Sequence, residues 1–229
     1  MGSGRVFSSV LLATALVGCE FAGDSTQAAA DKCGMRPMCG GAADPLYTCS
    51  DQWDAYDCQV LELAAAAGEP DPMIFKAQIS LESNFEVYAI SPDSPCKTPA
   101  GWTDAESKSF GLMQLTPACG WLKQARLPDN HPNLEQDMAA PGWATSVFNP
   151  LINVDEGVRA IQVDRASVMK AYPGCTVAQY TLMALAAFNQ GQSSVSGCTQ
   201  INAAGMNYIY YVRTRYENLA QAANWPIPY

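Results

Sequence analysis

The sequence predicts a mainly α-helical domain that follows a cysteine-rich N-terminal extension. Three observations support this prediction. From Gln52 onward, apolar residues recur three or four positions apart, which is the helical period. Pro and Gly separate the periodic segments, as they do between helices. No alternating polar and apolar run bounded by turns indicates a strand. The chain has 229 residues, enough for one domain with a self-supporting core.

The charge and composition exclude two classes of protein. The chain has 13 Lys and Arg against 22 Asp and Glu, a net charge of −9. A nucleic-acid-binding surface needs clustered Lys and Arg, so we expect no nucleic-acid partner. Hydrophobic residues make up 48% of the chain, which excludes an intrinsically disordered polyelectrolyte.

The N-terminus has the pattern of an export signal. Arg5 precedes a short apolar run, and the run ends in Leu16-Val17-Gly18-Cys19. A run of this length is typical of a signal peptide and too short for a comfortable membrane span. The final tetrad resembles the bacterial lipobox, in which the thiol of Cys19 receives a diacylglycerol. The alternative is an ordinary secretion signal in which Cys19 is incidental.

The cysteines agree with export to an oxidising compartment. If Cys19 is acylated, eight of the nine Cys remain, and eight can form four disulfides. The sequence does not determine the pairing, and local pairs are the simplest guess: Cys33–Cys39, Cys49–Cys58, Cys96–Cys119 and Cys175–Cys198. No C-x-x-C motif occurs, and the single His, His131, lies beside a Pro in a polar loop. We therefore expect no metal site.

Two helices are predicted before residue 91. The first covers about 52–67 and ends at a Gly-Glu-Pro stop signal. The second covers about 71–83 and begins with Asp-Pro, an N-cap followed by a Pro in the first turn. A long polar loop over 91–109 comes next, and a short helix is expected over about 111–125.

Three further helices are predicted in the second half, after a loop over 128–148. Asn153 is expected to cap a helix over about 154–171, with Glu156 in a capping-box position. The next helix, 176–189, is apolar on all sides, so we expect it to be the buried helix at the centre of the domain. The last helix covers about 205–223.

Glu82 is the residue whose position indicates chemistry. It lies on the inward strip of the second helix and in its last turn. Burial and the exposed carbonyls of a helix end both raise the pKa of a carboxyl group. An acid that is still protonated near neutral pH can give its proton to a leaving oxygen. Taken alone, a solvated or capping Glu is the commoner explanation of such a residue.

Four ordered motifs give Glu82 a context. They are E-S-N-F at 82–85, F-G-L-M-Q-L-T-P at 110–117, N-P-L-I-N-V at 149–154 and A-F-N-Q-G at 187–191. In this order they resemble the soluble lytic transglycosylase family, relatives of goose-type lysozyme, over about residues 70–219. The resemblance implies a lysozyme-like helical fold around a central buried helix. It also implies cleavage of the MurNAc–GlcNAc bond of peptidoglycan.

The resemblance assigns site residues by their positions in these motifs. Glu82 matches the family's lone catalytic acid. The expected substrate-binding residues are Ser83, Met113, Gln114, Phe188, Asn189, and Tyr208 or Tyr211 as the match to the family's C-terminal Tyr. Trp102, in the polar loop, is the Trp that we expect to stack on a sugar, although for any one aromatic residue a place in the core is the commoner explanation.

Two features depart from the family's pattern. The A-Y-N-A-G motif has Phe188 in place of its Tyr, so Tyr208 or Tyr211 is expected to supply the missing hydroxyl. In addition, 32 residues separate Glu82 from Gln114, which is longer than the family's spacing. We expect the surplus loop to line the substrate site, the alternative being a decoration pinned by a disulfide.

A single acid fits substrate-assisted chemistry. Two-carboxylate glycosidases need a second carboxylate facing the acid, and no motif holds one. The other carboxyl groups near Glu82 in the sequence are Glu86, Asp93, Asp104 and Glu106. In the expected lyase reaction, Glu82 protonates the glycosidic oxygen while the N-acetyl group of MurNAc stabilises the positive charge. The carboxylate then takes the proton of the C6 hydroxyl, which attacks C1 and gives a 1,6-anhydro sugar.

The sequence therefore predicts a lytic transglycosylase that acts on peptidoglycan glycan strands as a monomer and without a cofactor. We expect a signal peptide over 1–18, a lipidated tether and Cys-rich extension over 19–48, and a catalytic domain over 49–229. The protein is expected to be anchored by its lipid to a bacterial membrane, or else secreted. Two alternatives remain, a goose-type lysozyme-like hydrolase that uses water and an inactive glycan-binding lipoprotein. A structural disulfide-rich surface protein would leave the four motifs unexplained.

Overall fold

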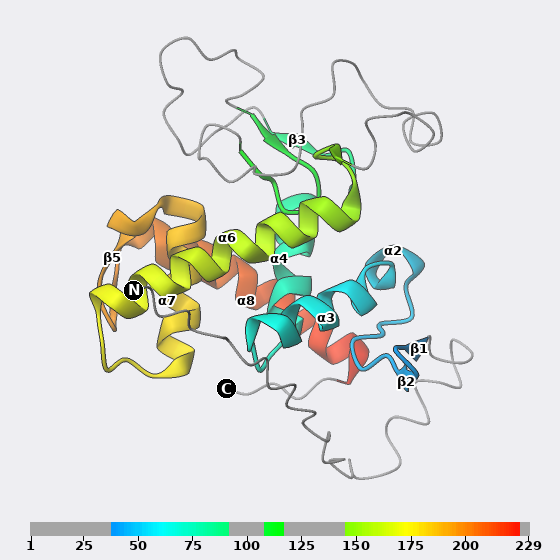
Figure 1. Cartoon of the computed structure of the whole chain (residues 1–229), viewed down its shortest axis with the longest axis horizontal. Helices are drawn as coiled ribbons and strands as arrows, with labels where there is room; N and C mark the ends of the chain where they lie inside the picture. The colour runs from blue at the N-terminus through cyan, green and yellow to red at the C-terminus, as the bar shows by residue number, and fades with distance from the viewer. Residues whose placement is uncertain (1–37, 92–107, 117–144, 225–229) are drawn as a thin grey trace, which may run out of the picture.

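The computed structural model describes residues 38–91, 108–116 and 145–224 (Figure 1). Several expectations concern residues outside these ranges, and they stay predictions. They are the signal peptide, the lipidation of Cys19, the roles of Cys33 and Trp102, the Cys96–Cys119 bond, residues 117–125 of the short helix, and the loops over 92–107 and 128–144.

The described part of the chain is mainly helical, as predicted. Its helices are α2 (Asp51–Asp54), α3 (Asp57–Ala67), α4 (Met73–Ser83), α6 (Pro150–Ala171), α7 (Val177–Gln190) and α8 (Ala203–Ala223), with a 3-10 turn η4 (Gln192–Ser194). The strands form three short antiparallel pairs, which are β1 (Met38–Cys39) with β2 (Ala42–Ala43), β3 (Ile90–Ser91) with β4 (Ser109–Phe110), and β5 (Val195–Gly197) with β6 (Gln200–Ile201). None of the described helices is long and apolar enough to cross a bilayer.

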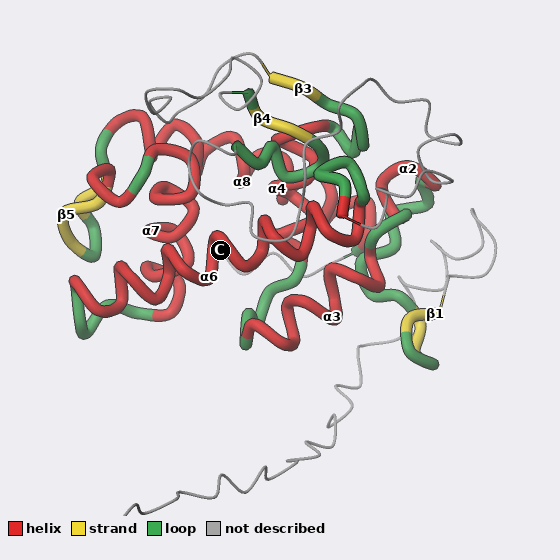
Figure 2. Tube along the Cα trace, turned by 45° about the horizontal axis from the view of Figure 1, so that its top comes forward, coloured by secondary structure: helices red, strands yellow, loops and turns green. Residues whose placement is uncertain are grey.

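The five longer helices pack in a closed series around the core. α7 packs against both α6 and α8, α8 packs against α4, and α3 contacts both α4 and α6. Figure 1 shows α6 crossing the front of the molecule with α4 behind it. Figure 2 shows β3 and β4 together along one edge of the helices. The core is lined by apolar residues of all five helices.

The most enclosed helix is α4 and not the helix predicted over 176–189. No residue of α4 is exposed, whereas the first two residues of α7 and its last residue are exposed. The enclosure of α4 was not predictable from its sequence, because two of its polar side chains, Lys76 and Gln78, are fully buried. Both make hydrogen bonds inside the protein, so the helix is buried without being apolar on all sides.

A buried polar cluster around the Lys76 ammonium attaches α4 to the Cys-rich extension. The ammonium of Lys76 donates to Leu46 O, Asp54 Oδ1 and Asp57 Oδ2, each at 2.7 Å. Burial raises the pKa of Asp57 to about 8, against the lowering effect of Lys76, and buried Asp44 adds to the rise. Burial also acts on Asp54, but hydrogen bonds from Lys76 and Thr48 leave the pKa of Asp54 lowered. The extension is therefore part of the domain's packing from residue 44 onward.

The local signals located some helix ends and missed others. α7 begins where predicted, because Thr176 and Gln179 form a reciprocal capping box. The helix predicted over 52–67 is interrupted at residues 55–56, where α2 ends and α3 begins. The helix predicted to begin after Asn153 begins one turn earlier, at Pro150, with Asn149 as its N-cap. Asn153 is therefore an interior helix residue and not a cap.

Residues 111–116, expected to start a helix, form a tight turn instead. Phe110 and Leu115 exchange both backbone hydrogen bonds, at 3.0 Å each, across this turn. Gly111 and Gln114 have φ angles of 73° and 47°. Two left-handed residues within four positions end any helix, and the spacing of the apolar residues does not reveal them.

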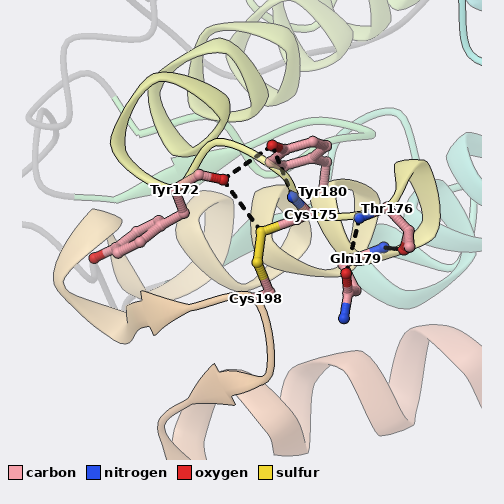
Figure 3. Close-up of a disulfide and its surroundings, with 6 residues drawn as sticks. All are labelled: Tyr172, Cys175, Thr176, Gln179, Tyr180 and Cys198. Carbon is pink, nitrogen blue, oxygen red and sulfur yellow. Dashed lines mark hydrogen bonds between the residues drawn. A yellow bond between two sulfur atoms is a disulfide. The ribbon is translucent and has the colours of Figure 1, made fainter.

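The disulfides differ in part from the predicted pairs. Cys175 bonds Cys198 as expected and joins the turn before α7 to the β5–β6 hairpin (Figure 3). Cys39 bonds Cys58, so the pairs Cys33–Cys39 and Cys49–Cys58 are wrong. Cys49 is also disulfide-bonded. The reason is tertiary: the β1–β2 hairpin lies against α3, and this packing brings the Cα atoms of Cys39 and Cys58 to 5.0 Å.

Figure 3 also shows how the turn before α7 is held. Tyr180 Oη donates to Tyr172 O at 2.9 Å and accepts from Cys175 N at 3.2 Å. The same turn supplies the capping box of Thr176 and Gln179. The C-terminal end of α6, the disulfide and the start of α7 therefore form one rigid corner.

Candidate active site

Glu82 lies at the end of α4, and the backbone after it turns sharply away from the helix. Asn84 caps α4 in the left-handed conformation, with φ 51°, and Phe85 follows with φ 64°. The Phe85 side chain is buried in the core, which holds this turn in place. Glu82 itself is partly buried. Its carboxyl group is thus fixed beside the carbonyl end of a helix, which disfavours the ionised form.

The carboxyl group of Glu82 has one hydrogen-bond partner among the described residues. Tyr208 Oη donates to Glu82 Oε1 at 2.5 Å. Burial raises the pKa of Glu82 to about 7, and the hydrogen bond from Tyr208 opposes this rise by stabilising the carboxylate. The group is therefore divided between its acid and its carboxylate form near neutral pH, as expected from its position in the sequence.

The antiparallel packing of α8 on α4 places Tyr208, and not Tyr211, against Glu82. Tyr208 lies near the start of α8, beside the end of α4. Two turns later, Tyr216 Oη donates to Asp71 Oδ2 at 2.7 Å, just before α4 begins. Tyr211 is 49% exposed, and its ring contacts Tyr210 with centroids 5.6 Å apart. Of the two candidates, Tyr208 is the one whose hydroxyl contacts Glu82.

Gln114 is tied to the segment that follows Glu82. Its Nε2 donates to Ala89 O at 3.2 Å and to Gly111 O at 2.9 Å. Gly111 N also donates to Ala89 O, at 2.8 Å, and the β3–β4 pair continues this connection. The 111–116 turn is therefore anchored to the chain only seven residues after Glu82. Gln114 itself is largely buried, and its amide group serves to hold this turn.

Asn153 holds the 111–116 turn from its other side. Its Oδ1 accepts from Met113 N at 2.7 Å, and its Nδ2 donates to Phe110 O at 3.0 Å and Val147 O at 2.8 Å. Asn153 was predicted from the sequence to be a helix cap, so this role was missed. The available signal was an Asn next to the apolar face of Val154 and Val158, where a polar side chain needs partners.

Two glycines allow α6 and the turn to approach this closely. A Cβ on Gly111 would lie 2.4 Å from Asn153 Nδ2, and a Cβ on Gly157 would lie 2.6 Å from the Met113 side chain. Gly111 also needs its positive φ. The G-L-M-Q and N-P-L-I-N motifs therefore form one packing unit, although 40 residues separate Met113 from Asn153.

Asn189 lies at the same end of the helices as Glu82 and Tyr208. α7 and α8 are in close contact near Gly205, where an added Cβ would lie 2.9 Å from the Ala186 Cβ. The last turn of α7, with Asn189, is thus next to the first turns of α8, with Tyr208. Asn189 is partly exposed, and its Oδ1 accepts from Gln190 Nε2 at 2.5 Å.

A comparison with protein-family models identifies the family of this chain. The model described as Transglycosylase SLT domain matches residues 59–210, well over half of the chain. The chain belongs to the SLT transglycosylase family. No curated protein sequence and no solved structure matches it. The matched residues extend from α3 into α8 and include Glu82, Gln114, Asn153, Asn189 and Tyr208.

Three residues expected against the substrate of this SLT domain are buried. Met113 is completely buried against Gly157, and Phe188 lies in the core. Ser83 is also buried, and its Oγ donates to Ile79 O at 3.1 Å, one turn back along α4. Ser83 and Phe188 lie on the inward faces of α4 and α7, and Met113 is buried within the 111–116 turn.

No second carboxylate of the described residues acts on Glu82. Glu86 is exposed on the turn after α4. Asp164, on α6, is buried, and its side chain is hydrogen-bonded to Gln192; burial raises the pKa of Asp164 to about 6. Asp93, Asp104 and Glu106 lie outside the described residues. Within the described ranges, no group of three His, Cys, Asp or Glu side chains is arranged to hold a metal ion.

Proposed function

We propose that this SLT-domain protein is a lytic transglycosylase that cleaves the MurNAc–GlcNAc β-1,4 bond of peptidoglycan. The observation that carries the proposal is Glu82, a single carboxyl group whose pKa is raised to about 7 and whose one described hydrogen-bond partner is Tyr208. Membership of the SLT transglycosylase family supports the same activity.

The proposed reaction uses Glu82 first as an acid and then as a base. The protonated carboxyl donates to the glycosidic oxygen as the bond to C1 breaks, and the N-acetyl group of MurNAc stabilises the positive charge. The Glu82 carboxylate then accepts the proton of the C6 hydroxyl, whose oxygen forms the new bond to C1. The products are a 1,6-anhydro sugar and a free GlcNAc hydroxyl, and Glu82 is again protonated.

The position of Glu82 supports both half-reactions. A pKa near 7 lets the same group give and accept a proton at neutral pH. Burial favours the neutral acid before the reaction, and the hydrogen bond from Tyr208 stabilises the carboxylate that forms during it. Asn189, partly exposed at the same end of the helices, is the amide that we propose contacts the sugar.

The other proposed properties come from the sequence. We propose that the protein is exported and lipid-anchored to a bacterial membrane through Cys19, and that it acts on glycan strands as a monomer and without a cofactor. A secreted form without the lipid is the alternative. The net charge of −9 gives no steering towards an anionic wall polymer, so binding is proposed to depend on uncharged sugar contacts.

Digestion of purified peptidoglycan, followed by mass spectrometry of the released muropeptides, tests the proposal. We expect the wild-type protein to release fragments with 1,6-anhydro ends. Glu82→Gln should release none, and Glu86→Gln, a neighbouring exposed Glu, should act as the wild type. Fragments heavier by one water would support the hydrolase instead. Binding of peptidoglycan without any release by the wild type would support the inactive glycan-binding protein.

A further inference from the structure

Gln78 is a buried polar residue one turn before Glu82 on α4. Its side chain is fully buried, and its Nε2 donates to Tyr208 Oη at 3.3 Å. Its Oε1 has no hydrogen-bond partner in the described part of the chain. A buried amide oxygen without a partner is unfavourable, and an apolar side chain of the same size would avoid this. The N–H group that reaches Tyr208 is the feature of Gln78 that an apolar residue cannot replace.

The two contacts of the Tyr208 hydroxyl determine where its proton points. The hydroxyl has a single proton and can accept hydrogen bonds through its oxygen. Because the Gln78 amide donates to that oxygen, the Tyr208 proton is directed to its other neighbour, Glu82 Oε1. Oε1 then serves as an acceptor, and a proton on the carboxyl group of Glu82 belongs on the other oxygen, Oε2.

We propose that Gln78 is a positioning residue that fixes Tyr208 as the donor to Glu82 Oε1 and thereby reserves Oε2 for the proton that is transferred. The transfer of that proton to the substrate rests on the proposed function. The hydrogen-bonded series from Gln78 through Tyr208 to Glu82 does not depend on it. Gln78 acts through Tyr208 and is not itself a catalytic residue.

No other charged group among the described residues faces the carboxyl group of Glu82. On α4, the Lys76 ammonium donates its hydrogen bonds to Leu46, Asp54 and Asp57. On the turn after α4, Glu86 is exposed. From α8, Tyr208 is the titratable group that faces Glu82, and the pKa of Tyr208 is raised by burial and by Glu82. The charged residues further along α8 are largely solvent-facing, and two of them, Arg213 and Glu217, pair with each other.

The direct test is the titration of the Glu82 carboxyl by carbon NMR in the full-length protein labelled at the glutamate side-chain carboxyl. Glu82→Gln assigns the signal. We expect Tyr208→Phe to raise the Glu82 midpoint by about one pH unit, because the donor is lost. Gln78→Met removes the N–H that polarises Tyr208, and we expect a smaller rise of about 0.3–0.5 units. The double variant should titrate as Tyr208→Phe does.

A matched control separates positioning from simple loss of packing. Ile79→Val perturbs the neighbouring, fully buried position on α4 without removing a side-chain hydrogen bond. It should lower stability but leave the Glu82 midpoint unchanged. In the peptidoglycan assay, Gln78→Met should lower kcat about three- to tenfold with KM unchanged, and should move the alkaline limb of the pH profile upward with the NMR midpoint.

Each outcome decides the inference. A Gln78→Met midpoint equal to that of the wild type would overturn it. So would a shift in the double variant equal to the sum of the two single shifts, because Gln78 would then act independently of Tyr208. A similar shift in Ile79→Val would assign the effect to packing. If the wild type releases no fragments from peptidoglycan but the NMR shifts follow the expected order, the hydrogen-bond arrangement holds and the proposed function fails.

Discussion

Replacing Glu82 by Gln is expected to stabilise the protein, by an amount that grows with pH. The pKa of Glu82 is raised from 4.5 to about 7, mainly by burial, so folding disfavours its ionised form. Gln is neutral at every pH and has an oxygen that can accept the hydrogen bond from Tyr208. The variant therefore removes a buried charge without removing the partner of Tyr208.

The size of the effect follows from the two pKa values. Because the folded pKa is the higher one, the wild type loses stability as the pH rises from 4.5 to 7, and the loss is complete above pH 7. A shift of this size corresponds to a stabilisation of Glu82→Gln over the wild type of about 1 kcal/mol at pH 5 and about 3 kcal/mol at pH 8. These figures describe a difference between two proteins, so contributions from Asp57 and Asp164, which are present in both, cancel.

Urea unfolding of the wild type and Glu82→Gln at pH 5 and pH 8 measures this difference. Glu86→Gln, at the exposed neighbouring Glu, is the control and should show no pH-dependent gain. A Glu82→Gln effect that is the same at both pH values, or a destabilisation at pH 8, would refute the reasoning, because the carboxyl group would then not be desolvated. The same variant should have lost the peptidoglycan activity, so a functional residue would be held at a cost in stability.

Two further predictions concern the residues that hold the site in place. Lys76→Met leaves the buried carboxyl groups of Asp54 and Asp57 without the ammonium that donates to both, and we expect urea unfolding to show a loss of about 3–5 kcal/mol, compared with almost none for Lys170→Met at an exposed position of α6; a loss as small as that of Lys170→Met would mean that Lys76 does not stabilise this cluster. Asn153→Ala removes three hydrogen bonds, those with Met113 N, Phe110 O and Val147 O, and we expect a loss of about 2–4 kcal/mol together with most of the activity, measured at a temperature where circular dichroism shows a folded protein. Full activity in that variant would contradict the role of the turn.

Local sequence signals were sufficient for part of the fold. The start of α7 was predicted to within one residue, and the structure explains it by Thr176 and Gln179, whose capping box involves only residues three positions apart. The placement of Glu82 in the last turn of a helix followed from the apolar period of its segment. The family resemblance came from four short motifs, each readable without knowledge of its neighbours in space.

Several site features were not predictable in the same way. Tyr208 and Tyr211 are three residues apart on one helix, and the sequence could not decide which of them lies near Glu82. Only the packing of α8 against α4 directs Tyr208 to Glu82, 126 residues earlier in the chain. Met113 and Phe188 belong to the predicted motifs, yet their side chains complete the core. Motif membership identified the segments near the site but not the direction of each side chain.

The sequence by itself determined the helical class, the family and the identity of the carboxyl group on which the proposal rests, because helical period, caps and motifs are properties of nearby residues. The tertiary structure alone decided which helix is enclosed, which cysteines pair and which hydroxyl meets Glu82. Those outcomes depend on contacts between segments far apart in the chain. Such contacts are set by the fit of whole helix faces, as at Lys76, Gln78 and Asn153, whose polar side chains are buried together with hydrogen-bond partners from distant segments.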